Sequence, residues 1–382
     1  MKLKCLLGLH AWCGCKCSVC GAIRDKDHRW QGCRCQVCNG TRSTGHDFRN
    51  GCTCVVCGVT NHVWDKPTGK CSRCGCGARI ISSLADFDGM RRDLGGFYRL
   101  EVDIDASTPH FRPIGDEKAP FSGSFDGNGH IVRLRFDVPD APHAMSLFGV
   151  NAGLISGVTV ECALSGGAAV AGGLVGQNAH SGHVSRCNAH GSIDGRFVCA
   201  GGLVGLNEGT VELCASDSRV NSSSTLGTAG GLVGQNTGKI VKSYAQGSAS
   251  RALHAGRLAG AHTGTIDECY ATTALVVPST LGRVAHEGLV ACRYDPWHDP
   301  ISRTLPENTG VISRSYWLVS EVSQSLFGGG IVLESPDKEN GVPAQSDAMK
   351  RRATYEGWDF VETWVLDEGQ SFPRLRCLTE QG

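Results

Sequence analysis

The stretch "AGGLVGQN" at residues 171–178 recurs as "AGGLVGLN" at 200–207, "AGGLVGQN" at 229–236 and "AGRLAGAH" at 255–262. The steps between copies are 29, 29 and 26 residues, and a second β-rich element such as "GTVELCASDS" separates them. Short β segments with glycine turns at a fixed period of this length are typical of a solenoid, because one period is too small to close its own core. The repeat therefore predicts an all-β solenoid of about six or seven coils.

Three columns of similar residues run through the copies. They are Leu174, Leu203, Leu232 and Leu258; Val175, Val204 and Val233; and Asn178, Asn207 and Asn236. Successive coils lie about 4.8 Å apart, so one of the two aliphatic columns is expected to face the core. The stacked asparagines are expected to exchange side-chain amide hydrogen bonds from coil to coil.

A fourth column contains Cys187, Cys214, Ser243 and Cys269, with Val158 in the preceding copy. Neighbouring coils are close enough for a disulfide between Cys187 and Cys214. However, a position that also accepts Val or Ser does not require a bridge. The column therefore favours small buried side chains with free thiols, and the disulfide is the alternative.

The segment 83–95 is expected to form an amphipathic helix with Ser83 as its N-cap. Its apolar positions share one face and are Leu84, Phe87, Met90 and Leu94. Solenoids need such a cover over the first coil because open strand edges aggregate.

The chain resembles the GLUG-motif family of right-handed parallel β-helices, found in bacterial surface proteins and beside IgA-protease-type modules. The stretches that carry the resemblance beyond the repeats are "SLADFDGMRRDLGGFYRLEVDID" (83–105), "FSGSFDGNGHIVRL" (121–134), "SYWLV" (315–319) and "YEGWDFVETWVLDEGQSFPRL" (355–375). The resemblance implies a right-handed parallel β-helix. Its expected parts are an N-terminal cap at 81–120, coils at 121–320 and a closing segment at 321–382.

Residues 1–80 have a different composition and hold 14 of the 21 cysteines. A His-x-aromatic step recurs at His10, His28, His46 and His62, and a cluster of three cysteines follows each step. Each period thus supplies three Cys and one His, the ligands of one closed tetrahedral zinc site. Periods of about 18 residues with few aliphatic side chains cannot fold by burial alone, and zinc binding would supply the missing stability.

Two groupings of these ligands remain open. Taking each His with the cysteines that follow it predicts four sites: His10, Cys15, Cys17 and Cys20; His28, Cys33, Cys35 and Cys38; His46, Cys52, Cys54 and Cys57; and His62, Cys71, Cys74 and Cys76. Taking each His with the preceding cysteines predicts three sites and leaves Cys71, Cys74 and Cys76 without a histidine. Residues 10–77 resemble the tandem short zinc-ribbon-like Cys/His repeats of bacterial proteins, and the expected cofactor is three or four structural Zn²⁺ ions.

Charge and hydropathy give the expected compartment and partners. Residues 1–80 carry a formal charge of +9 and residues 81–382 carry −9. No run approaches the roughly 18 apolar residues of a membrane span, and the apolar run in "MKLKCLLGLHAWC" is too short for a signal sequence. These features predict a cytoplasmic protein without membrane insertion; a cell-surface or non-classically secreted protein is the alternative.

The sequence contains no Ser-His-Asp set, phosphate-binding loop or dinucleotide fingerprint, and no Asp/Glu pair that recurs in register. We therefore predict no catalytic residue and no enzymatic activity. The predicted function is a scaffold that presents an extended β-helix surface to a protein or glycan partner, with the zinc repeats as a docking head. The alternatives are a nucleic-acid-binding protein that uses the basic zinc repeats, and a β-helix enzyme that acts on polysaccharide. The insertion at 292–310 is a further candidate for a binding loop.

Overall fold

The structure of the 382-residue chain is a computed structural model. It describes residues 77–108, 111–139, 144–224, 227–250, 254–276, 288–290, 310–319 and 341–379, and, in the N-terminal part, residues 12–13, 16–18, 30–31, 34–36, 64–65 and 70–71. The chain divides into two compact units, Met1–Ala78 and Arg79–Gly382.

The described part of the first unit consists of three antiparallel hairpins. They pair β1 (Trp12–Cys13) with β2 (Lys16–Cys17), β3 (Trp30–Gln31) with β4 (Arg34–Cys35), and β5 (Trp64–Asp65) with β6 (Lys70–Cys71). In every hairpin the tryptophan of the His-x-aromatic step lies directly opposite a cysteine. The sequence repeat is therefore also a repeat of local structure.

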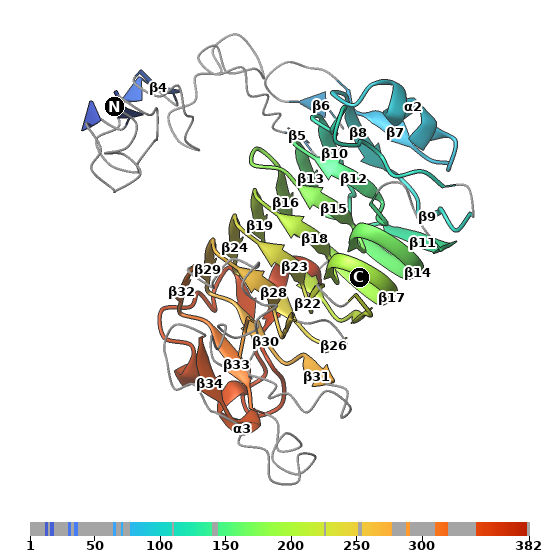
Figure 1. The fold of residues 1–382 in the computed structure, drawn as a ribbon. Coiled ribbons are helices and arrows are strands. Elements are labelled where there is room, and N and C mark those ends of the chain that lie inside the picture. Colours follow the sequence, from blue (N-terminus) through green and yellow to red (C-terminus); the bar gives the residue numbers. More distant parts are fainter. Residues whose placement is uncertain are drawn as a thin grey trace. The chain divides into compact units, whose positions relative to one another are not determined.

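The second unit is a parallel β-solenoid of about seven turns, which confirms the predicted fold class. Within the described residues its strands form three long parallel sheets, in which each strand pairs with the equivalent strand of the next coil (Figure 1). Strands of one coil thus lie in different sheets. This arrangement follows from the repeat, because each coil can bury its apolar residues only against its neighbours.

The nine-stranded sheet contains, in chain order, β7 (Arg79–Ile81), β8 (Phe97–Leu100), β10 (Ser124–Asp126), β13 (Leu154–Ser156), β16 (His183–Ser185), β19 (Thr210–Glu212), β24 (Lys239–Val241), β29 (Thr265–Asp267) and β32 (Val311–Ser313). The five-stranded sheet contains β12 (Phe148–Asn151), β15 (Val175–Asn178), β18 (Val204–Asn207), β23 (Val233–Asn236) and β28 (Ala259–His262).

The fourteen-stranded sheet contains β9 (Ile104–Asp105), β11 (Ile131–Val138), β14 (Thr159–Gly172), β17 (Asn188–Gly201), β20 (Ala215–Ser216), β21 (Arg219–Ser222), β22 (Thr228–Gly230), β25 (Tyr244–Ala245), β26 (Ser248–Ser250), β27 (His254–Gly256), β30 (Tyr270–Ala271), β31 (Ala274–Val276), β33 (Tyr316–Leu318) and β34 (Val342–Ala344). Its two longest strands, β14 and β17, have 14 residues each.

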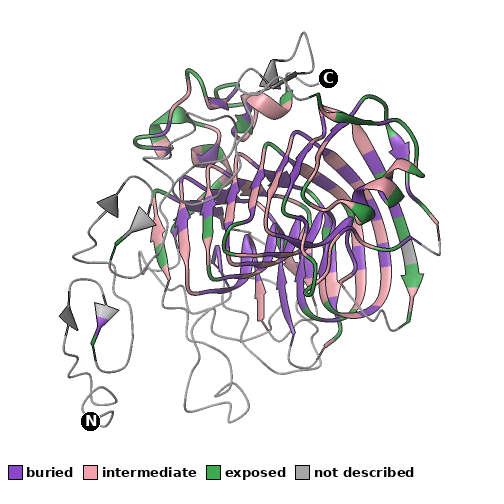
Figure 2. Cartoon of the chain, turned by 90° about the horizontal axis from the view of Figure 1, so that it is seen from above, coloured by how far each residue is buried: buried purple, intermediate pink, exposed green. Residues whose placement is uncertain are grey.

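The core contains both aliphatic columns, not one as expected from the sequence. Leu203 and Val204 are both fully buried, as are their counterparts in the other coils. A straight strand would send these two neighbours to opposite faces. Here the chain bends at Gly202 and Leu203 just before β18, so both side chains turn inward. Figure 2 shows where buried and partly exposed residues lie along the coils.

The asparagine column forms the predicted ladder inside the solenoid. The Nδ2 of Asn178 donates to Oδ1 of Asn207 at 2.8 Å, and the Nδ2 of Asn207 donates to Oδ1 of Asn236 at 2.7 Å. The ladder is longer than the sequence indicated, because Asn151 donates to Asn178 at 2.8 Å and His262 accepts from Asn236 at 3.0 Å. All five side chains are buried, so each amide satisfies the next where water is absent.

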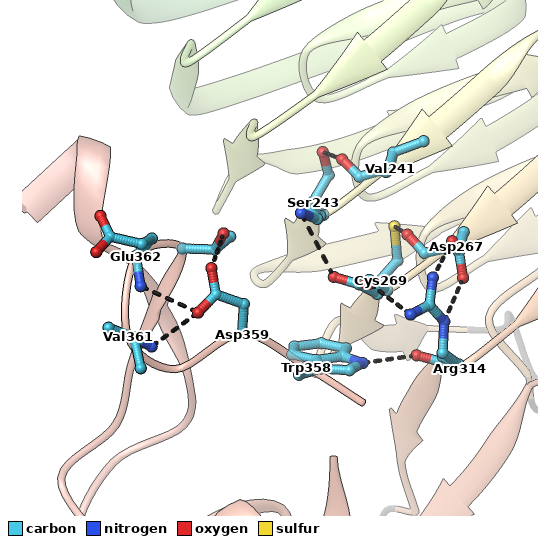
Figure 3. Close-up of polar contacts among 12 residues, drawn as sticks. Val241, Ser243, Asp267, Cys269, Arg314, Trp358, Asp359, Val361 and Glu362 are labelled. Atoms are coloured by element: carbon cyan, nitrogen blue, oxygen red, sulfur yellow. Dashed lines mark hydrogen bonds and ion pairs between the residues drawn. The ribbon is translucent and has the colours of Figure 1, made fainter. Parts of the chain in front are cut away.

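The cysteine column has free, buried thiols, as predicted, and the alternative disulfide does not form. The Sγ of Cys214 donates to the carbonyl of Glu212 at 3.1 Å, and the Oγ of Ser243 donates to the carbonyl of Val241 at 2.8 Å. Cys and Ser therefore exchange freely in this column because both supply a small donor to the same turn. Figure 3 shows the Ser243 contact.

The predicted helix over 83–95 is shorter than expected and is capped differently. The helix α2 (Asp86–Arg92) begins three residues later, and Ser83 gives no side-chain cap. Instead, Asp86 accepts hydrogen bonds from the backbone N–H and hydroxyl of Ser83 at 2.8 and 3.0 Å. The helix ends before Gly95 and Gly96, which favour non-helical backbone. The predicted apolar face is correct: Phe87 and Met90 are buried, and Leu84 and Leu94 pack against the same core.

The C-terminal segment packs on the outside of the coils, where it forms a second apolar cluster. Its elements are α3 (Ser346–Met349), η5 (Arg352–Thr354), β35 (Trp364–Val365), β36 (Arg374–Leu375) and α4 (Arg376–Thr379). Tyr244 and Tyr270 stack with ring centroids 5.0 Å apart, and Trp364 covers Tyr270 at 6.1 Å. The tryptophan Nε1 of Trp358 also donates to the carbonyl of Arg314 at 2.9 Å (Figure 3).

A candidate binding face on the long strands

The longest strands of the solenoid, β14 and β17, present their outward side chains on one face of the fourteen-stranded sheet. Along β14, Val160, Cys162 and Leu164 point into the core and are buried, while the residues between them are partly exposed. This strict alternation in "TVECALS" is the two-residue period of a strand with one buried face. We call the outward side chains here the polar face; it comprises Arg133, Arg135, Asp137, Glu161, Ala163, Ser165, His190, Ser192, Asp194, Asp217, Arg219, Asn221, Ser248 and Ser250.

One row of the polar face alternates in charge from coil to coil. Arg133, Glu161 and His190 lie side by side on β11, β14 and β17. The Nε of Arg133 lies 2.9 Å from Oε2 of Glu161, and the Nδ1 of His190 lies 2.5 Å from Oδ1 of Asp217 in the next coil. The other ring nitrogen of His190 lies 2.8 Å from Nδ2 of Asn188. The row thus contains two ion pairs, and each of them links two successive coils.

The carboxylates around His190 favour its charged form. The hydrogen bond to Asp217 raises the pKa of His190 above its ordinary value, the charges of Asp217 and Glu161 raise it further, and partial burial opposes them. An imidazole with a raised pKa holds its proton closer to neutral pH and can give it to a bound group. His190 is therefore the described side chain of this face best suited to proton transfer.

A second row consists of carboxylate, hydroxyl and amide groups. Asp137, Ser165, Asp194, Asn221 and Ser250 occupy one register in five successive coils. The Oγ of Ser165 donates to Asp137 at 2.8 Å, and the Nδ2 of Asn221 donates to Asp194 at 3.1 Å. The Oγ of Ser250 donates to Oδ1 of Asn221 at 3.3 Å. These contacts fix the side-chain orientations and leave further lone pairs open to the outside.

Charge on the polar face is balanced. Its acidic residues are Asp137, Glu161, Asp194 and Asp217, and its basic residues are Arg133, Arg135, His190 and Arg219. The Nη2 of Arg219 lies 2.8 Å from Oδ2 of Asp194, so this pair is neutralised within the face. Large apolar side chains are nearly absent from this face. Among the described residues of β14 and β17, Val198 is the one strongly exposed example, at 51 %.

The sequence did not point to this face because its residues differ from coil to coil. Aligning the copies shows Arg133, Glu161, His190 and Asp217 at equivalent places without any shared residue type. A search for carboxylates that recur in every coil therefore passes over them, because Glu161 and Asp217 are two coils apart. Two-residue alternation within "TVECALS" and "NAHGSID" marks the outward positions, and that signal was available from the sequence.

The predicted metal ligands lie almost entirely outside the described residues. Cys17, Cys35 and Cys71 are in described strands, and Cys17 is buried and not part of a disulfide. The other predicted ligands are His10, Cys15, Cys20, His28, Cys33, Cys38, His46, Cys52, Cys54, Cys57, His62, Cys74 and Cys76. The insertion at 292–310 also lies outside the described part, except for Gly310. In the part that the structure describes, no group of three or more His, Cys, Asp or Glu is placed to hold a metal ion.

The hairpin register clarifies how the fourth cysteine cluster aligns with the others. Trp12 pairs with Cys17, Trp30 with Cys35 and Trp64 with Cys71. Each of these cysteines begins a Cys-x-x-Cys pair in the sequence. The order of the fourth cluster is therefore less altered than its sequence suggests, and Cys76 is its additional member.

No protein-family model and no curated protein matches the sequence. Among solved structures, the chain is similar to a protein from Bacteroides ovatus that is provisionally named an immunoglobulin A1 protease, with a TM-score of 0.58 and 19% identity, over 79% of this chain and 93% of that one. A chain named IgA1 protease matches with a TM-score of 0.46 and 18% identity, over 62% of this chain and 19% of that one. The first similarity establishes an IgA-protease-like β-solenoid fold. The GLUG assignment stays a prediction.

One prediction is overturned by this comparison. We predicted from the absence of familiar motifs that the protein is not an enzyme, but the solved structure that shares its fold is named as a protease. A motif search was a poor criterion because it finds only known patterns of residues that are close in sequence. The surface of a solenoid can bring reactive groups together from separate coils. Within the described residues, no helix is long and apolar enough to cross a membrane, and the longest, α2, has 7 residues.

Proposed function

We propose that the solenoid is a binding module that holds an extended protein or glycan partner along the polar face, and that immunoglobulin A1 is the first partner to test. The observation that carries the proposal is the run of oriented polar side chains at one register over five coils, from Asp137 to Ser250. The fold shared with a protein named as an IgA1 protease supports the choice of partner.

A direct binding measurement tests this proposal. The full chain is applied to immobilised immunoglobulin A1, and the variant Arg135→Glu reverses an exposed charge of the polar face. We expect binding at least about tenfold weaker, because the variant removes a charged hydrogen-bond donor, and a hydrogen bond from such a group is worth about 1.5 kcal/mol or more. The matched control is Lys239→Glu, the same charge change at an exposed residue of the nine-stranded sheet. Equal binding by both variants would rule out the polar face as the contact surface.

We also propose that residues 10–77 bind three or four structural Zn²⁺ ions through the predicted Cys and His ligands. The three hairpins support this, because each brings the first cysteine of a Cys-x-x-Cys pair to the end of a short strand. The thiolates would hold the metal and so stabilise a unit with little apolar core. A reducing, cytoplasmic setting fits free thiols, and in this proposal the unit serves as a docking head.

Metal analysis of the intact protein tests the zinc proposal. About four zinc ions per chain would support grouping each His with the following cysteines, and about three would support the other grouping. A folded protein without metal, whose N-terminal cysteines are paired as disulfides, would refute both groupings. A nucleic-acid partner for this basic unit would instead show steep salt dependence of binding.

A second candidate function is acid–base catalysis on the bound partner. It is favoured by His190, whose imidazole lies against Asp217 and is influenced by Glu161 on the neighbouring strand. The test is incubation of the full chain with immunoglobulin A1 or a polysaccharide, followed by analysis of the fragments. His190→Gln should lose the activity while keeping binding; fragments formed equally by this variant would exclude His190 from the reaction.

A further inference from the structure

We infer that the partner of the polar face is a neutral, hydroxyl-rich glycan strand that runs along the solenoid axis. This inference rests on the binding function proposed above and narrows its partner class. It is drawn from three properties of the face: the spacing of its hydrogen-bonding groups, its charge balance and its lack of apolar anchors.

The spacing repeats with the coil. In the row from Asp137 to Ser250 a polar side chain recurs on each successive strand, about 4.8 Å from the last. Asn221 keeps one free N–H donor, and Asp194 offers acceptors. Ser165 and Ser250 spend their hydroxyl hydrogens within the row and offer acceptors as well. A polymer whose units carry several hydroxyl groups can bond to this row at many successive points. Such repeated weak contacts add up through the high effective concentration of the linked units.

The charge balance argues against a polyanion. Asp194 and Arg219 neutralise each other at 2.8 Å, and Glu161 and Arg133 do so at 2.9 Å. A surface that binds a nucleic acid or an acidic polysaccharide needs an excess of Lys and Arg, which this face does not have. An uncharged ligand meets no such requirement, and its hydroxyl groups can bond to either member of each pair.

The side chains between the rows argue against a folded protein surface. Protein interfaces owe most of their affinity to a few buried aromatic or large apolar anchors. The middle row of the polar face contains no aromatic or large apolar residue; its members are Arg135, Ala163, Ser192, Arg219 and Ser248. Val198 beside the face is the one strongly exposed large apolar residue of β14 and β17 in the described part. A polar surface without such anchors suits an extended, hydroxyl-rich chain better than it suits a folded protein.

A glycan array tests the inference with the intact chain. The labelled protein is applied to neutral and acidic glycans, together with the double variant Asp194→Ala/Asn221→Ala. The matched control is Lys239→Ala/Thr265→Ala, two exposed or half-exposed residues of the nine-stranded sheet. We expect retention on neutral oligosaccharides, a loss of at least about tenfold in the double variant, and retention equal to the native chain in the control. Circular dichroism of each variant shows whether the solenoid is still folded.

Two results would overturn the inference and separate it from the proposed function. If no neutral glycan retains the protein, yet enzymatically deglycosylated immunoglobulin A1 still binds and Arg135→Glu weakens that binding, the partner is a polypeptide: the binding function stands and the glycan assignment is wrong. If neither glycans nor immunoglobulin A1 bind, both are wrong. Retention on acidic glycans alone would also contradict the charge argument.

Discussion

Replacing Asn207 by Asp tests the direction of the asparagine ladder. The Oδ1 of Asn207 accepts from Asn178 at 2.8 Å, while its Nδ2 donates to Oδ1 of Asn236 at 2.7 Å. The side chain is fully buried. Asn207→Asp keeps the shape and the acceptor, but it sets a carboxylate oxygen against Oδ1 of Asn236, which is itself an acceptor. Asn207→Ala removes both bonds without adding a charge, and it also removes the contacts of Nδ2 with the carbonyls of Gly209 and Lys239 at 3.4 and 3.2 Å.

The expected magnitudes follow from these contacts. In Asn207→Ala, Oδ1 of Asn236 loses its donor, whereas Asn178 keeps bonds to the carbonyls of Gly182 and Thr210 at 3.2 and 3.3 Å. One stranded acceptor and a small cavity lower the free energy of unfolding by about 2–3 kcal/mol. A buried, unpaired carboxylate costs about 3–5 kcal/mol, so Asn207→Asp should be the less stable variant at neutral pH.

The two variants should also differ in pH dependence. Burial and the facing acceptor raise the pKa of the introduced carboxyl above its ordinary value. The loss of stability is then complete above the folded-state pKa and disappears as the pH falls to the unfolded-state pKa, because the protonated group can donate to Asn236. Asn207→Ala has no such group, so its deficit relative to the native chain should not shrink in this way.

Urea unfolding of the full chain, followed by far-ultraviolet circular dichroism at about pH 7.5 and about pH 5, measures both effects. Comparison with Asn207→Ala at each pH removes the contribution of other titrating groups. Asn188→Asp, at a half-exposed site beside His190, is the control and should change stability little. If Asn207→Asp is no less stable than Asn207→Ala at pH 7.5, or gains nothing at pH 5, the ladder does not run in the direction described.

Three further predictions concern single coils. His262 ends the ladder as an acceptor, and burial lowers its pKa to about 4. The free energy of unfolding should therefore fall by up to about 3 kcal/mol as the pH drops from about 6.5 to about 4, and His262→Asn should abolish this loss when urea unfolding is measured across that range. Because the pKa of His190 is raised, its pairing with Asp217 stabilises the chain below the ordinary histidine pKa, and this stabilisation is lost as the pH rises through the folded-state pKa. His190→Gln should therefore flatten the dependence of unfolding free energy on pH in that range. An unchanged dependence would show that the pair is not coupled to folding. Gly157 has φ +65° at a turn where Arg186 of the next coil has φ 52°, and a Cβ added at Gly157 would meet its nearest neighbour at an ordinary 3.6 Å. The backbone conformation alone should therefore make Gly157→Ala lower the unfolding free energy by about 1 kcal/mol, whereas Arg186→Gly should not lower it. Equal losses for the two variants in thermal melts would contradict this explanation.

The sequence predicted the interior of the solenoid well because stacking forces equivalent residues into equivalent surroundings. Leu203, Asn207 and Cys214 each have counterparts one period away; Leu203 and Cys214 are buried, and Asn207 forms the expected amide ladder. The prediction that one aliphatic column faces inward was wrong because it assumed a straight strand. A bend at Gly202 lets Val204 follow Leu203 into the core, and a glycine pair before two aliphatic residues is a signal that can be used in other solenoids.

The ends of repeated features were harder to predict than their middles. Asn151 and His262 complete the ladder, but they occur in diverged copies where the repeat is weak. The helix near residue 86 likewise starts later than expected, because Asp86 binds back to Ser83 and leaves no role for a serine cap. The coils of Asn151 and His262 pair with neighbours on both sides in the nine-stranded sheet, so the structure extends the ladder beyond the copies that the sequence repeat identifies.

The same reasoning explains why the candidate site was not visible in the repeats. An inward side chain must fit the coils on both sides, whereas an outward side chain such as Glu161 or His190 contacts solvent and can differ in every coil. Binding or catalysis needs particular groups at particular places, which breaks the repeat. A search for periodicity therefore finds the residues that form the core of the solenoid and passes over the surface residues that could bind or react. In this fold the alternate positions of the longest strands, β14 and β17, are the place to look for function, and the lack of recurrence among them is the expected property of a working surface.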